Sequence, residues 1–180
     1  MKRNMLFALL ALSISGTAIA AQSDAEFLAA HCLAGKTTEQ MVEAIDGSTQ
    51  ARPLPYNAGI TSSDLKLSDG TQQFSYPLGD KFYLSFAPYL TQTHPCFNHS
   101  LSGCRGELAN TPFDVKVTDE SGKVLMQKQM TSHANGFVGI WLPRDMVGTI
   151  EVSYQGKKAT APIATHTSSQ TCLTTLPLLG

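Results

Sequence analysis

The chain has 180 residues, of which 42% are hydrophobic and only 15% are charged, and its formal net charge is −1. This nearly neutral, evenly spread charge excludes the basic footprint of a nucleic-acid-binding protein and a polybasic membrane-binding patch. A chain of this length forms one ordinary domain or two small ones, and it can bury an adequate core without covalent staples.

The N-terminus has the three parts of a secretory signal peptide. Lys2 and Arg3 form a basic start, residues 5–12 form an apolar run too short to span a bilayer, and residues 18–20 are a small-x-small cleavage site. We expect residues 1–20 to be removed on export; the alternative is an N-terminal membrane anchor. Without Lys2 and Arg3, 11 basic and 14 acidic residues remain, a net charge of −3. No later segment is long and apolar enough to cross a membrane.

Two short helices are predicted at the start of the mature chain. Ser23 and Glu26 have the spacing of a capping box at the beginning of the first helix, which we expect over residues 23–33. A second capping box at residues 37–40 begins the other helix, which places its apolar residues on one face and ends at Gly47. Since neither helix is long enough to be stable alone, we expect the pair to pack against another part of the chain.

The segment of residues 51–69 contains prolines that prevent a regular helix. We expect it to be a connection, with one turn or a short strand near Leu65 and Leu67. This change of character places a domain boundary between a helical region with its linker, residues 21–70, and a second domain, residues 71–180.

The second domain alternates polar and apolar residues at period two, and turns rich in glycine, proline and aspartate separate the alternating segments. The six or seven expected strands recur at intervals of about ten residues, a spacing typical of an antiparallel β-sandwich. They cover residues 72–76, 81–87, 113–118, 123–130, 137–142, 149–154 and 158–164. The sequence therefore predicts an α+β protein that is mainly β, with a small helical N-terminal region and a β-sandwich-like C-terminal domain.

A long segment without strand signals, residues 88–111, interrupts this series, and loops of that length are more often functional or specially stabilised than idle. It contains four soft-ligand residues within eleven positions: His94, Cys96, His99 and Cys104. Cys172 can supply a third thiol if the C-terminal tail folds back over this loop. Thiolate and imidazole favour Cu(I) or zinc over harder ions, and zinc is less favoured because closed zinc sites usually have tighter paired spacings.

The four cysteines also allow disulfides, in three pairings. A bridge between Cys96 and Cys104 would close a nine-residue loop, and a bridge between Cys32 and Cys172 would join the helical segment to the tail. Two alternatives to a metal-binding protein therefore remain: a disulfide-stabilised binding module without metal, and a thiol oxidoreductase that acts on proteins. The lack of a C-x-x-C motif argues against the oxidoreductase. In an oxidising compartment, Cys96 and Cys104 can be a bridge in one state and metal ligands in another.

The segments HPCFNHSLSGCRGEL and FVGIWLPRD and the Thr171-Cys172 tail together resemble the CueP family of periplasmic copper-binding proteins, over essentially the whole chain. The resemblance implies a periplasmic protein that binds copper, supports copper tolerance and supplies copper to a periplasmic Cu/Zn superoxide dismutase. It also implies a homodimer.

The three cysteines of the family correspond to Cys96, Cys104 and Cys172. The resemblance implies that their thiols bind Cu(I) and take part in reducing Cu(II) to Cu(I), and that a periplasmic thiol-disulfide reductant restores them. His94 and His99 are the candidate histidine ligands, and the family does not assign a role to Cys32.

Overall fold

The computed structural model describes residues 23–180, so the expected signal peptide lies outside the described residues. Within that range, no helix is both long and apolar enough to cross a membrane. The elements follow in the order α1 Asp24–Ala30, α2 Thr38–Asp46, β1 Asn57–Ile60, β2 Asp64–Ser68, β3 Gln73–Pro77, β4 Lys81–Tyr89, β5 Pro112–Asp119, β6 Val124–Thr131, β7 Val138–Pro143, β8 Val147–Tyr154, β9 Lys157–Ala164 and β10 Cys172–Pro177.

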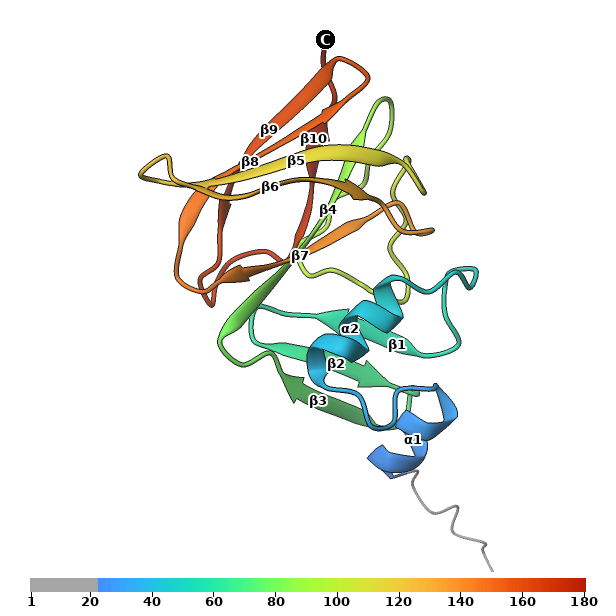
Figure 1. The fold of residues 1–180 in the computed structure, drawn as a ribbon. Coiled ribbons are helices and arrows are strands. Elements are labelled where there is room, and N and C mark those ends of the chain that lie inside the picture. Colours follow the sequence, from blue (N-terminus) through green and yellow to red (C-terminus); the bar gives the residue numbers. More distant parts are fainter. Residues whose placement is uncertain (1–22) are drawn as a thin grey trace, which may run out of the picture.

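The strands form three sheets, ordered β1-β2-β3, β10-β4-β7 and β6-β5-β8-β9 (Figure 1). The last two sheets pack face to face, and the period-two apolar residues of β4, β5 and β8 fill the core between them. All pairs are antiparallel except β10 with β4, which is parallel. The prediction of a mainly β protein with a small helical part is confirmed.

Both predicted capping boxes are present. The Ser23 hydroxyl accepts a hydrogen bond from the Glu26 N–H, and the Glu26 carboxylate accepts one from the Ser23 N–H. Thr37 and Gln40 make the same reciprocal pair at the start of α2. Helix α1 ends earlier than expected, at Ala30, because the following turn places Cys32 in the left-handed region at φ 58°.

The segment expected to be a connection is more ordered than its composition indicates. The strand near Leu65 and Leu67 is confirmed as β2, but the sequence prediction missed β1. Strands β1 to β3 form a sheet of their own, and β3 pairs with β2 rather than with a strand of the sandwich. The helices pack on this small sheet and bury a second core that includes Phe27 and Val42.

Seven of the nine residues of β4 are buried, and they lie on both faces of the strand. Strand β4 therefore joins the two cores. Phe82, Leu84 and Phe86 belong to the sandwich core, whereas Tyr83 points into the core of the small sheet. The chain between β4 and β5 returns to the small sheet, where the Ile60 N–H donates to the His99 carbonyl at 2.8 Å. This long loop is therefore held at the junction between the sandwich and the small sheet.

Candidate metal centre

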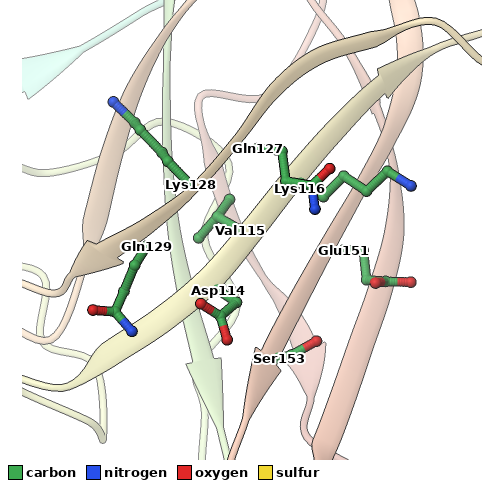
Figure 2. Close-up of a pocket in the computed structure, with 8 residues that line it drawn as sticks. All are labelled: Asp114, Val115, Lys116, Gln127, Lys128, Gln129, Glu151 and Ser153. Carbon is green, nitrogen blue, oxygen red and sulfur yellow. The ribbon is translucent and has the colours of Figure 1, made fainter.

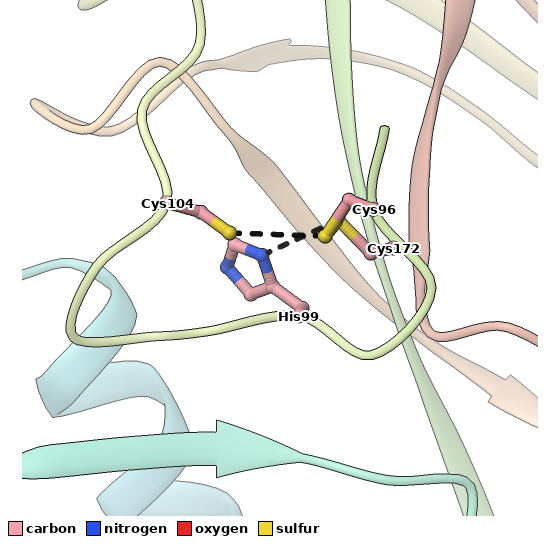
Figure 3. A group of neighbouring side chains, drawn as sticks. All are labelled: Cys96, His99, Cys104 and Cys172. Atoms are coloured by element: carbon pink, nitrogen blue, oxygen red, sulfur yellow. Dashed lines mark hydrogen bonds between the residues drawn. A yellow bond between two sulfur atoms is a disulfide. The ribbon is translucent and has the colours of Figure 1, made fainter. Parts of the chain in front are cut away.

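Three cysteines and one histidine come together at this junction. The ligand atoms of Cys96, His99, Cys104 and Cys172 all lie within 4.8 Å of one another (Figure 3). The Cys96 and Cys104 sulfurs are 3.7 Å apart, and His99 Nδ1 is 3.8 Å from the Cys172 sulfur. His99 and Cys172 are completely buried, whereas Cys96 and Cys104 are partly exposed. The group thus has a buried side and a solvent side.

Backbone hydrogen bonds position these ligands. The Phe97 carbonyl accepts from the N–H groups of Thr171 and Cys172 at 2.9 and 3.1 Å, which holds the start of β10 against the loop. The Thr171 hydroxyl accepts from the His99 N–H at 3.0 Å and donates to the Ile60 carbonyl at 2.7 Å. The tail therefore folds back over the loop, and it does so as a sheet strand that the sequence prediction had missed.

The structure contains a disulfide between Cys96 and Cys172, while Cys32 and Cys104 are free. Neither bridge considered from the sequence is formed here. Cys32 is exposed in the turn after α1, and β10 instead brings Cys172 beside β4 and under the loop. Sequence spacing favoured Cys104 as the partner of Cys96, and the two sulfurs are indeed in contact without being bonded.

Asp46, the last residue of α2, orients the buried imidazole. Its Oδ1 lies 3.0 Å from His99 Nε2 and also accepts a hydrogen bond from Asn135 Nδ2 at 2.7 Å. Its Oδ2 accepts from the Tyr83 hydroxyl at 2.7 Å. Since a buried carboxylate is tolerated only when it is paired and hydrogen-bonded, this arrangement satisfies Asp46 and directs His99 Nδ1 toward the sulfurs, as outer-shell carboxylates do at histidine metal sites.

Asp46 and His99 each stabilise the charged form of the other. Burial alone would raise the pKa of Asp46, but His99 and the Tyr83 hydroxyl lower that pKa to about 2. Burial alone would lower the pKa of His99, but Asp46 raises it to about 9. An ion pair is therefore the stable form of Asp46 and His99 at neutral pH.

Arg52 connects this ion pair to the loop. Its guanidinium donates to the carbonyls of Ile45 and Asp46, both at 3.0 Å, at the C-terminal end of α2. The same side chain donates to the Leu101 carbonyl at 3.2 Å. One buried cation therefore caps the helix that carries Asp46 and fixes the loop that carries His99 and Cys104.

Cys104 is the free thiol of the group. Burial raises the pKa of this thiol, but hydrogen bonding and charge from His99, with a smaller effect from His94, lower the pKa to about 7 from an ordinary value of 9.0. His94 itself lies outside the group of four and is partly exposed. Of the five predicted site residues, the structure thus brings four together and leaves His94 at the edge.

Gly139 on β7 makes room for the Tyr83–Asp46 contact, because a Cβ at this position would overlap the Tyr83 hydroxyl. We expect Gly139→Ala to displace that hydroxyl and to destabilise the protein by about 1–3 kcal/mol in urea unfolding. Gly59→Ala is the control: its Cβ would meet nothing closer than the His99 carbonyl at 3.6 Å. Equal effects of the two substitutions would contradict the assignment of Gly139.

A pocket on the outer face of the sheet β6-β5-β8-β9 has a different character (Figure 2). Its lining is mostly polar and charged, including Asp114, Lys116, Gln129 and Glu151, and it contains no cysteine or histidine. This pocket offers no soft ligand, so the cysteine–histidine group is the better candidate for a metal centre.

The fold and the site together define a mainly β protein with a candidate soft-metal centre of three cysteines and one buried histidine. The family model described as "Periplasmic copper-binding protein CueP" matches residues 40–177. The chain therefore belongs to the CueP family and is a periplasmic copper-binding protein, which confirms the family and the compartment predicted from the sequence.

A solved structure described as "Crystal Structure of S.CueP" is similar throughout. It is 65% identical in sequence, has a TM-score of 0.86, and the match covers 88% of this chain and 99% of that chain. The search of curated proteins found no match.

Proposed function

We propose that the protein sequesters Cu(I) through the thiolates of Cys96, Cys104 and Cys172, with Nδ1 of His99, which releases its proton when the ion binds, as a fourth donor. The observation that carries this proposal is the convergence of these four ligand atoms within 4.8 Å. Thiolates with one imidazole suit Cu(I), and zinc is the less favoured ion. His94, on the solvent side next to Cys104, assists as copper enters.

The disulfide between Cys96 and Cys172 makes this function dependent on redox state. Two thiols that oxidise to a disulfide release two electrons and two protons, which suffices to reduce two Cu(II) ions to Cu(I). Conversely, a periplasmic thiol-disulfide reductant must supply two electrons and two protons to restore the thiols, because the periplasm is kept oxidising. We propose that Cys96, Cys104 and Cys172 perform this cupric reduction together, since their sulfurs are mutual neighbours.

The family resemblance supports the rest of the proposed cycle. Copper held at this site passes to a periplasmic Cu/Zn superoxide dismutase, and the protein acts as a homodimer. The partly exposed residues Cys96 and Cys104 provide the solvent-side route that transfer to an acceptor protein requires.

The test is a Cu(I) titration of the fully reduced protein against a competing chelator. Substitution of an outer-shell residue typically weakens metal binding about 10–100-fold. Cys104→Ser and Cys172→Ser each remove a ligand, so we expect them to weaken Cu(I) binding by more than this. Cys32→Ser is the matched control and should bind as wild type does, because Cys32 lies outside the group of four. Cu(I) affinity of both site variants equal to wild type would show that the copper ligands lie elsewhere.

A further inference from the structure

The two faces of β4 serve different parts of the molecule. Leu84 and Phe86 face the sandwich core, whereas Tyr83 holds Asp46 and Ala87 contacts the cysteines. Successive side chains of a strand point to opposite faces, so Ser85 lies between Tyr83 and Ala87 on the face toward the metal centre.

Ser85 is unusual for a buried residue. Its side chain is 0% exposed, and its hydroxyl has no hydrogen-bond partner among residues 23–180. Its backbone N–H, in contrast, donates to the Thr171 carbonyl at 2.9 Å. Nearly all buried polar side-chain atoms are hydrogen-bonded, and each exception needs an explanation. An alanine would fill this position without leaving a donor unpaired.

The neighbour of Ser85 across the sheet is Cys172, which is its register partner in the parallel pair of β4 and β10. The next pair along, Phe86 with Leu173, faces the sandwich core, so Ser85 and Cys172 share the opposite face. In the disulfide, the Cys172 sulfur is a weak acceptor. Once reduced, this sulfur is no longer bonded to that of Cys96 and is free to accept from the Ser85 hydroxyl.

We propose that Ser85 is a positioning residue for the reduced state, in which its hydroxyl donates to the Cys172 sulfur. The proposal rests on the proposed function in that copper binding needs the reduced thiols. The step concerned is the reduction of the Cys96–Cys172 disulfide by two glutathione molecules, which gives two protein thiols and one glutathione disulfide. The Ser85 hydroxyl is unpaired on the oxidised side of this reaction and paired on the reduced side, so it shifts the equilibrium toward the thiols.

The experiment equilibrates the copper-free protein with glutathione and its disulfide and counts the alkylated thiols. For Ser85→Ala we expect an equilibrium constant for reduction about tenfold lower, which corresponds to a potential about 30 mV more negative. Ser85→Thr keeps the hydroxyl and should restore most of the wild-type value. Ser132→Ala is a matched control, because that buried hydroxyl bonds to Leu108 and Thr111 and not to a cysteine.

Ser85→Ala would also shift the equilibrium toward the disulfide if it only removed the unpaired hydroxyl and so stabilised the oxidised form. Urea unfolding of the oxidised and reduced forms separates this cause from the loss of a hydrogen bond in the reduced form. The proposal requires Ser85→Ala to destabilise the reduced protein while leaving the oxidised protein at least as stable as wild type. Reduced Ser85→Ala protein as stable as reduced wild type would overturn it. Since no copper is present, this result stands apart from the Cu(I) titration that tests the proposed function.

Discussion

Asp46→Asn is expected to destabilise the oxidised protein by about 3 kcal/mol and to weaken Cu(I) binding by the reduced protein about 10–100-fold. The asparagine has nearly the same shape and can still accept from Tyr83. It cannot neutralise His99, which is 0% exposed and 3.0 Å from the carboxylate. Urea unfolding and Cu(I) competition measure the two effects. Glu39→Gln, a change on the same helix that removes only the ion pair of Glu39 with Lys81, is the control. It should alter stability by less than about 1 kcal/mol and leave Cu(I) binding unchanged.

The pH dependence of stability gives this prediction a second readout. The pKa of Asp46, about 2 in the folded protein against 3.8 ordinarily, stabilises the fold above pH 3.8, and this contribution is lost as pH falls through 2. The pKa of His99, about 9 against 6.5, stabilises the fold below pH 6.5, and this contribution is lost as pH rises through 9. Wild type should therefore be most stable between these limits, and Asp46→Asn should show a flatter profile. An alkaline loss of stability that is unchanged in the variant would count against the pairing.

The fold could be predicted where its signals are local. The capping boxes at Ser23 and Thr37 mark both helix starts, because each motif satisfies backbone donors within four residues. The alternating segments of the sandwich were found for the same reason. Strand β1 was missed because it has only four residues, and β10 was missed because its buried residues do not alternate with exposed ones. Strand β10 also pairs with β4, which lies more than eighty residues earlier.

The candidate site was predictable in part. Cys96, His99 and Cys104 are close in sequence, and Cys172 was identified only as a further thiol in the tail. Spacing could not choose the disulfide, because Cys96 has two sulfur neighbours and the choice depends on how β10 docks. No motif marks Asp46 either. The only available signal was an acid on the apolar face of α2, four residues after the buried Val42.

Several hydrogen bonds hold the site together independently of the disulfide. The Phe97 carbonyl holds the N–H groups of Thr171 and Cys172, and the Thr171 hydroxyl holds His99. Arg52 binds the Leu101 carbonyl from the other side. Reduction therefore frees the sulfurs of Cys96 and Cys172 while their backbones remain in place. Because the site is already held in its binding geometry, less conformational entropy is lost when an ion binds.

The reactivity of Cys104 is the prediction that links His99 to the thiol chemistry. With a pKa of about 7, about half of this thiol is ionised at neutral pH. We expect His99→Gln to return the pKa to 9 or above, because the burial that raises it remains. The rate of alkylation by iodoacetamide at neutral pH should then fall about 50-fold, in proportion to the thiolate fraction.

The alkylation is measured across pH on the oxidised protein in a Cys32→Ser background, so that Cys104 is the single free thiol. Wild-type His99 should give a profile with its midpoint near pH 7. His94→Gln is the matched control, because its effect on the Cys104 pKa is smaller than that of His99, and it should shift the midpoint less. The intact disulfide between Cys96 and Cys172 keeps the loop and β10 joined in all three proteins. A midpoint that stays near 7 in His99→Gln would mean that a group other than His99 promotes the ionisation of this thiol.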